Sequence, residues 1–209
     1  MEIFVQQVVS GLATGSIYAA LALALVMIYE ATDVVNFAQG EMAMFATYIC
    51  WTLLNAGLPY WAAFFATVAI AFAGGVAIER IVIRPVENAP ILSIVIVTIG
   101  LLLGFNSLAG WIYSFVQQPF PSPFPKDPLR VGDIVFGAHD LGQIGVTLVV
   151  LVCIYVFFRY TPLGLAMRAA AQNPVSSRLV GVRVGWMLAL GWGLAAMFGA
   201  VAGMMVAPV

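Results

Sequence analysis

Three polar side chains stand directly before a long apolar stretch of the sequence: Asn36, Gln39 and Glu41. The uncharged stretch 42–54 beyond them has 13 residues, which an α-helix would extend over about 20 Å. A bilayer core is about 30 Å thick, so a helix that crosses it here must begin earlier and include some of these polar groups. Polar groups at that depth face protein or a water-filled cavity, and they are candidate residues of a transport path.

A second interpretation of Glu41 concerns the end of the helix alone. If the helix begins near Gln39, Glu41 lies in its first turn, where a carboxylate favours the positive end of the helix dipole. Asp33 and Asn36 are the residues suited to its N-cap. The two interpretations are compatible where a helix begins at a solvated cavity, so both stay open.

The second informative stretch is the segment 159–184, which is basic and rich in alanine. The dipeptide Thr161-Pro162 predicts the N-cap and first residue of a short helix that runs to about Gln172. The dipeptide Asn173-Pro174 predicts the same for a second helix, which ends near Gly181. Two such helices indicate either a docking element for a soluble partner or an interfacial pair attracted to anionic lipid by arginine.

Other polar side chains are sparse within the apolar stretches. They are Thr14, Ser16, Tyr18, Thr98, Asn106 and Ser107. We expect most of them to bond to a backbone carbonyl or a neighbouring helix, and a few, among them Tyr18, Thr98 and Asn106, to line a path. Their sparseness favours an amphipathic or apolar solute over a hydrated ion, which usually needs rings of charge or of carbonyls.

Several kinds of site have no support in the sequence. His139 is the only histidine and has no cysteine or histidine nearby, so we predict no metal site. Lys126 is the only lysine, and no glycine-rich phosphate-binding motif accompanies it, so the chain has no ATP site of its own. Cys50 and Cys153 lie in apolar stretches and are expected to act as small apolar residues. No catalytic residue or cofactor is predicted, and a net charge of −1 does not favour nucleic acid.

The elements that must position these residues are membrane helices. Of the 209 residues, 63% are apolar and 8% are charged, whereas a soluble domain carries about 25% charged residues. This composition excludes a water-soluble enzyme, and the alternation over roughly ten residues that barrel strands require is missing. We predict an all-α polytopic integral membrane protein, one transmembrane domain over 1–209, with a Pro-rich loop at 115–140. The predicted spans are 5–28, 34–56, 60–79, 91–114, 141–158 and 185–207.

The charges sort along the chain and predict its topology. Residues 1–79 hold five acids and no lysine or arginine, and residues 141–209 hold four arginines and no acid. With six spans, one set of alternating loops carries six arginines and the other carries only Lys126 and Arg130. Positive residues mark cytoplasmic loops, so the segment 159–184 is predicted to lie inside, and the loop 115–140 and both chain ends outside.

Small residues recur every four positions on three of the predicted spans. They are Gly11, Gly15 and Ala19; Ala69, Ala73 and Ala77; and Gly191, Ala195, Gly199, Gly203 and Ala207. Such stripes let helix backbones approach closely. The close approach occurs either within this chain, which we favour, or against a second chain.

Four motifs resemble, in family order, the permease subunits of branched-chain amino acid ABC importers. They are GLATGSIYAAL at 11–21, VNFAQGE at 35–41, ERIVIRP at 79–85 and MRAAAQNP at 167–174. Their spacing resembles the first of the two paralogous subunits, the H-type. Family members usually continue past a sequence like that at 207–209 with further helices, so a C-terminally truncated, fragmentary or shortened homologue is expected.

The resemblance implies half of a translocation pathway in the bacterial inner membrane, and a transport subunit rather than an enzyme. It implies a second permease subunit, two cytoplasmic ATP-binding subunits and a periplasmic or lipid-anchored solute-binding protein as partners, in contact with membrane lipid. The path would run beside Asn36, Gln39 and Glu41. The loop 159–184 would couple to the ATPases through Arg168, Ala169, Ala170, Ala171, Asn173 and Gly181, although Ala-Ala-Ala stands where many importers have Glu-Ala-Ala.

Three alternatives are consistent with the same residues. The first is a permease for another small solute, such as urea, an amide or a sugar. The second is a stand-alone secondary transporter or channel, which the lack of paired charges within the spans disfavours for proton coupling. The third is a membrane enzyme, which the shortage of titratable groups disfavours.

Overall fold

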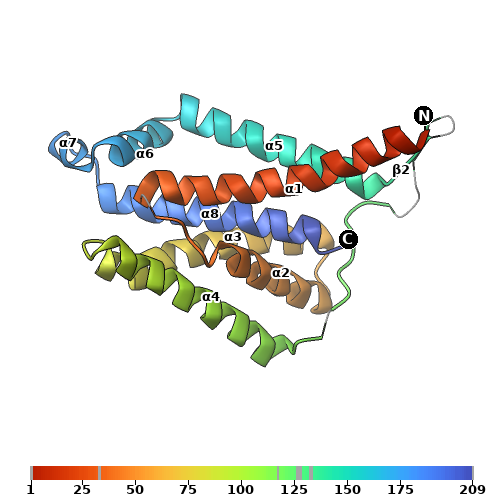
Figure 1. The fold of residues 1–209 in the computed structure, drawn as a ribbon, viewed down its shortest axis with the longest axis horizontal. Helices are drawn as coiled ribbons and strands as arrows, with labels where there is room; N and C mark the ends of the chain where they lie inside the picture. The colour runs from red at the N-terminus through yellow and green to blue at the C-terminus, as the bar shows by residue number, and fades with distance from the viewer. Residues whose placement is uncertain (1, 33, 117, 126–128, 132–133, 209) are drawn as a thin grey trace.

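The long apolar stretches form one bundle of helices that run along a common direction (Figure 1). The computed structural model describes residues 2–32, 34–116, 118–125, 129–131 and 134–208. Its α-helices are α1 (Glu2–Thr32), α2 (Gln39–Asn55), α3 (Tyr60–Ile78), α4 (Ile91–Tyr113), α5 (Ala138–Tyr160), α6 (Pro162–Gln172), α7 (Pro174–Leu179) and α8 (Val184–Val206). The π-helix η1 (Glu79–Ile83) and the 3-10 helix η2 (Arg84–Val86) continue α3, and the strands β1 (Leu129–Val131) and β2 (Ile134–Phe136) pair antiparallel.

The predicted all-α membrane fold is confirmed. Among the described residues, five helical stretches are long and apolar enough to cross a membrane: 4–30, 60–86, 91–113, 138–160 and 184–206. They correspond to five of the six predicted spans. The stretch 60–86 is longer than the predicted span 60–79, because η1 and η2 extend α3. Helix α5 begins at Ala138, inside the predicted loop 115–140.

The predicted span 34–56 differs from the structure. Helix α2 begins at Gln39 and has 17 residues, which is about 25 Å of helix and less than a bilayer core of about 30 Å. The residues just before it are not helical, and Val34, Asn36 and Ala38 among them are buried. Non-helical backbone at membrane depth is tolerated where protein covers it, so this part of the crossing depends on its neighbours.

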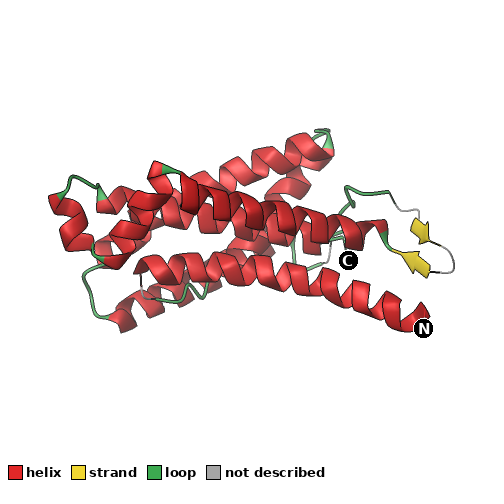
Figure 2. Cartoon of the chain, turned by 90° about the horizontal axis from the view of Figure 1, so that it is seen from above, coloured by secondary structure: helices red, strands yellow, loops and turns green. Residues whose placement is uncertain are grey.

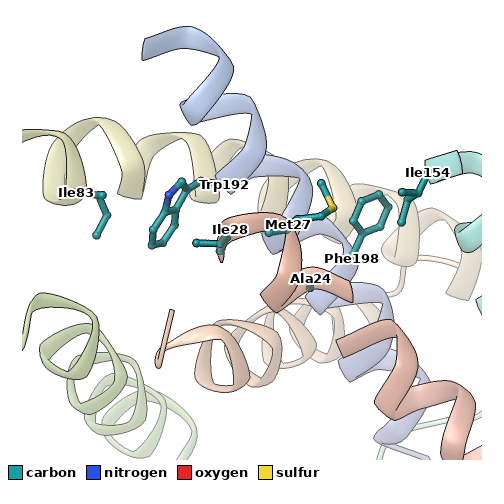
Figure 3. Packing of buried hydrophobic residues seen from close by; sticks show 8 residues of the cluster. Ala24, Met27, Ile28, Ile83, Ile154, Trp192 and Phe198 are labelled. Atoms are coloured by element: carbon teal, nitrogen blue, oxygen red, sulfur yellow. The ribbon is translucent and has the colours of Figure 1, made fainter. Parts of the chain in front are cut away.

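Helix α8 forms the core of the bundle and contacts α1, α2 and α3. Its backbone approaches α3 closely, because a Cβ on Gly75 would lie 2.5 Å from the Trp192 carbonyl oxygen and 2.9 Å from the Cα of Gly193. Figure 3 shows the apolar cluster that surrounds one side of α8. The cluster contains Ala24, Met27, Ile28, Ile83, Ile154, Trp192, Ala195 and Phe198.

The connections divide between the two ends of the bundle. Both chain ends and the β1–β2 hairpin lie at one end, and α6 and α7 lie at the other (Figures 1 and 2). Six arginines belong to elements at the α6–α7 end: Arg80, Arg84, Arg159, Arg168, Arg178 and Arg183. This is the sorting that the predicted topology requires. The assignment of this end to the cytoplasm stays a prediction.

The three stripes of small residues have different surroundings. The stripe on α8 is buried over Gly191, Ala195 and Gly199, which agrees with packing inside the chain. The stripes on α1 and α3 are exposed. Their residues are Gly11, Gly15 and Ala19 on α1, and Ala69, Ala73 and Ala77 on α3.

Candidate functional site

The start of α2 is held against α8 by two buried amide side chains. Asn36 Oδ1 accepts the Ala38 N–H at 3.0 Å, and Asn36 Nδ2 donates to Gln39 Oε1 at 3.3 Å. Gln39 Nε2 donates to the Ala195 carbonyl oxygen of α8 at 2.9 Å. Asn36 and Gln39 are each 1% exposed, so these two predicted pathway residues are buried where the start of α2 meets α8, and they face protein.

The N-terminal end of α2 shows which residues cap the helix and where Glu41 lies in it. The N-cap is Ala38, without a side-chain cap bond, so the expectation that Asn36 caps the helix is wrong. Its side chain instead bonds to the backbone two residues on, as asparagine does in turns. Asp33 lies outside the described residues. Glu41 lies in the first turn, as expected.

Glu41 and Asn106 are brought together by α2 and α4. Asn106 Nδ2 donates to Glu41 Oε2 at 3.3 Å. Glu41 is half-buried and Asn106 is exposed, so this pair is open to its surroundings. A carboxylate beside an amide is costly against hydrocarbon. This side of α2 therefore suits water or another protein better than lipid.

Aromatic side chains continue this side of α2 toward its C-terminal end. The rings of Tyr48 and Tyr113 stack with centroids 4.6 Å apart, and those of Phe45 and Phe105 lie 5.4 Å apart. Thr52 Oγ1 donates to the Tyr113 hydroxyl at 3.0 Å. These contacts fix α4 against α2 and hold Asn106 within reach of the Glu41 carboxylate.

A cavity of about 460 Å³ lies beside α2, against α1 and α8, and Tyr48 belongs both to its lining and to the aromatic side of α2. Its lining is Ile17, Tyr18, Leu21, Gly40, Ala43, Met44, Thr47, Tyr48, Trp51, Gln118, Phe120, Ala202, Gly203, Val206 and Ala207. The volume falls within the range of about 300–1,000 Å³ that is usual for small-molecule sites. Most of the lining is apolar, and Gly40, which is next to Glu41, leaves the wall open because a Cβ there would meet no described atom within 4 Å.

The six predicted pathway residues thus separate into four groups. Tyr18 lines the cavity, and Glu41 and Asn106 form the polar pair. Asn36 and Gln39 are buried and hold the start of α2 against α8. Thr98 is buried in α4 and donates to the Val95 carbonyl oxygen at 2.9 Å, so its hydroxyl is bonded to its own helix.

The two predicted helices of the segment 159–184 are present with the predicted caps. Thr161 Oγ1 accepts the Gly164 N–H at 3.0 Å at the start of α6, and Asn173 Oδ1 accepts the Ser176 N–H at 2.9 Å at the start of α7. Gly181 has a φ of +88°, a conformation that glycine adopts without steric cost. These local bonds shape the turn that returns the chain to α8.

The surface of α6 and α7 differs in part from the predicted coupling set. Arg168, Asn173 and Gly181 are exposed, and Ala169 and Ala171 are half-buried. Ala170 is 2% exposed and lies on the inner side of α6. The sequence interpretation missed five exposed apolar side chains, Leu163, Leu165, Val175, Leu179 and Val180. Helical periodicity in α6 could have found Leu165, since it lies off the buried face of Met167 and Ala170.

The single histidine joins the Pro-rich loop to α8 through hydrogen bonds. His139 Nδ1 lies 2.9 Å from Ser122 Oγ, and Nε2 lies 3.1 Å from the Met205 carbonyl oxygen at the end of α8. These bonds hold the Pro-rich loop and α5 against α8. Over the described parts of the chain, no group of three or more histidine, cysteine, aspartate or glutamate side chains is arranged to hold a metal ion.

These features define a multi-pass membrane protein whose α2 borders an apolar cavity and carries a polar pair. Over residues 7–209 the chain matches the model of the family described as branched-chain amino acid transport system / permease component, and it belongs to this family. The resemblance noted from four motifs is therefore confirmed.

Several curated relatives carry permease names. The chain is 28% identical to the high-affinity branched-chain amino acid transport system permease protein LivH of Escherichia coli (strain K12), covering 97% of this chain and 70% of that protein. It is 28% identical to BraD of Pseudomonas aeruginosa over the same shares. It is 29% identical to a probable LivH of Methanocaldococcus jannaschii, over 88% of this chain and 60% of that protein. No solved structure matches the chain. Permeases of this kind are transport subunits and not enzymes.

Proposed function

We propose that this chain is the membrane-spanning permease subunit of an ATP-driven ABC importer for branched-chain, aliphatic amino acids, and that it forms half of the translocation pathway. The observation that carries the proposal is that an apolar cavity and the Glu41–Asn106 pair both lie beside α2. The family description and the relatives' names support the choice of solute.

The cavity and the polar pair beside α2 suit the two parts of an aliphatic amino acid. The cavity wall of Leu21, Met44 and Val206 favours a branched hydrocarbon side chain, because apolar surface leaves water there. The Glu41 carboxylate can accept hydrogen bonds from an ammonium group, and the Asn106 amide can donate to a carboxylate. A solute that moves along α2 therefore keeps its polar and apolar parts in suitable surroundings.

The coupling segment, residues 159–184, is proposed to dock on a soluble ATPase subunit. Exposed Leu165, Leu179 and Val180 offer apolar contacts, and Arg168 and Arg178 offer charge at the same end of the bundle. In this arrangement two ATP-binding subunits lie on the cytoplasmic side, a second permease subunit covers the open side of α2, and a solute-binding protein delivers the amino acid at the opposite end. The membrane is the bacterial inner membrane, with the N-terminus outside.

The pathway is tested by filling the cavity from Gly40. Leucine at this position meets no described neighbour at its Cβ, so Gly40→Leu should fold normally. We expect uptake of labelled leucine by the complete importer in proteoliposomes to fall about tenfold, because the added side chain occupies the cavity. The matched control is Gly145→Leu on α5, where a Cβ also meets no described atom within 4 Å. Equal uptake by both variants would contradict the pathway.

The docking role is tested by reversing charge and polarity on α6. The double variant Leu165→Asp, Arg168→Glu should lose both ATPase stimulation and uptake, while Glu87→Arg at the same end should keep both. Ala170 is unsuited to this test because it is buried. If the double variant stimulates the ATPase normally, the segment does not dock there. Uptake driven by an ion gradient without any ATPase would instead identify a secondary transporter, and competition by urea or sugar would change the solute.

A further inference from the structure

The end of α3 contains a π turn that places two opposite charges side by side. Residues five apart lie about 140° apart around an α-helix, so Glu79 and Arg84 would point in different directions there. In η1 the Arg84 N–H bonds to the Glu79 carbonyl oxygen, five residues back. The side chains meet, with Arg84 Nη2 3.0 Å from Glu79 Oε2 and Arg84 Nε 3.3 Å from Glu79 Oε1.

The pair is joined to the first turn of α8. Glu79 is 1% exposed, and a buried carboxylate needs a charged or hydrogen-bonding partner. Arg84 provides it and also donates through Nη2 to the Gly185 carbonyl oxygen. A Cβ on Gly185 would lie 3.3 Å from the Arg84 Nη2, so glycine leaves room for the guanidinium.

A second arginine, Arg80 of η1, reaches the neighbouring residue of the same α8 turn. The Cζ of Arg80 lies 3.4 Å from the centroid of the Trp186 ring, within the distance of a cation–π interaction. Two consecutive residues of α8, Gly185 and Trp186, therefore each receive one arginine from the end of α3. We call Glu79, Arg80 and Arg84 the η1 clamp.

The clamp lies where the coupling segment joins the bundle. Only residues 180–183 separate α7 from α8. A groove of about 400 Å³ lies between α6 and the first turns of α8, lined by Ala166, Val182 and Met187 among others. A displacement of α6 and α7 therefore reaches α8 through its first turn, the turn that the η1 clamp holds.

Further along its length, α8 contacts the start of α2. Its Ala195 carbonyl oxygen accepts the Gln39 side-chain N–H, two residues before Glu41. Along the same length, the α8 backbone approaches α3 closely at Gly75, and the side chains of Phe72 and Val76 of α3 pack against Gly193. A body made of α3 and α8 would thus carry the first turn of α2 with it.

We propose that Glu79, Arg80 and Arg84 are positioning residues that fix the start of α8 to α3, so that movement of the coupling segment is passed to both helices and on to α2. The inference rests on the proposed function, because it presupposes an ATPase that moves the segment. The clamp itself touches no solute and no nucleotide. Without it, the segment would move α8 independently of α3, and the pathway beside α2 would stay unmoved.

The test measures transport and hydrolysis in the same vesicles. The complete importer is reconstituted with Glu79→Gln or Arg84→Lys, variants that keep side-chain size or charge but weaken the pair. We expect ATP hydrolysis to continue while solute molecules transported per ATP fall by about 5-fold to 150-fold, the usual range of coupling between two sites. Glu87→Gln, an exposed acid at the same end, should keep the wild-type ratio.

Three outcomes would overturn the inference. One is a wild-type ratio in both clamp variants. Another is joint loss of hydrolysis, uptake and complex assembly, which would show a purely structural ion pair. Absence of ATP-driven uptake by the unaltered importer would overturn the proposed function as well, and the wild-type sample distinguishes this failure from that of the clamp.

A distance measurement tests the clamp without transport. Spin labels are placed at exposed positions 88 and 180 of the complete importer, with Cys50 and Cys153 replaced. In wild-type background the two labels should keep one narrow distance with and without ATP. Arg84→Lys should broaden this distribution, and an unchanged distribution would contradict the clamp.

Discussion

Helices α1 and α8 carry the same stripe of small residues in opposite surroundings. A Cβ on Gly203 of α8 would lie 2.7 Å from the Ala43 carbonyl oxygen of α2. A Cβ on Gly11 or Gly15 of α1 would meet no atom of the described residues within 4 Å. That side of α1 instead borders a groove of about 560 Å³ against α5.

The difference teaches that a small-residue stripe permits a close approach without selecting the element that approaches. In lipid there is no hydrophobic driving force between helices, so a glycine contributes where a second backbone reaches it. Helix α8 has α1, α2 and α3 around it, whereas most of the stripe side of α1 is exposed. The spacing of four residues is the same in both helices, and their places in the bundle decide its effect.

The largest effect is expected from two neighbouring glycines of α3. A Cβ on Gly75 would lie 2.5 Å from a backbone oxygen of α8, whereas one on Gly74 meets nothing described within 4 Å. Gly75→Val should lower the free energy of unfolding by about 3 kcal/mol more than Gly74→Val. Unfolding of the purified protein in mixed micelles, titrated with SDS, measures both. Equal losses would break the comparison between packed and open glycines.

A change of sign is expected between the two stripes. Gly203→Ala should destabilise by about 1–2 kcal/mol, because its Cβ would overpack against α2. Gly15→Ala should stabilise by up to about 1 kcal/mol, since alanine favours the helix more than glycine does. Thermal denaturation of both variants in the same detergent gives the signs. Stabilisation by Gly203→Ala would mean that α2 is less tightly held than the distances indicate.

The smallest effect is expected on the exposed stripe of α3. Ala73→Leu adds apolar surface where the side chain is exposed, and both residues favour helix. The unfolding free energy should change by no more than about 0.5 kcal/mol. A larger loss in the isolated chain would show that this stripe contacts something, and it would sharpen the distinction between the three stripes.

The parts of the fold that were predicted correctly have local causes. Uncharged stretches set five of the spans, and the caps at Thr161 and Asn173 arise from residues that lie beside the bonds they make. The start of α2 at Gln39 agrees with the second sequence interpretation, in which Glu41 lies in the first turn, and differs from the predicted span 34–56. Two residues of the predicted pathway, Glu41 and Asn106, are in contact in the structure. They are 65 residues apart in the sequence, so the sequence alone does not show this contact.

The parts that were missed depend on long-range packing. The cavity beside α2 combines residues from three helices and the Pro-rich loop. Burial of Asn36 and Gln39 depends on where α8 passes. The π turn at Glu79 has no propensity signal, because its side-chain pair forms only in the wider turn.

That π turn makes the helix sensitive to length as well as to composition. A π turn bonds residues five apart where an α turn bonds residues four apart, so η1 behaves as a single inserted residue. Deleting one residue among 81–83 would place Glu79 and Arg84 four apart in a continuous α-helix, about 40° apart around its axis, where the two side chains still share a face. A continuous α-helix of unchanged length would instead place them about 140° apart. All three members of the η1 clamp would remain in that helix, yet Arg84 would no longer meet Glu79. At this junction the register of the helix, more than any one side chain, determines whether the two parts of the protein are connected.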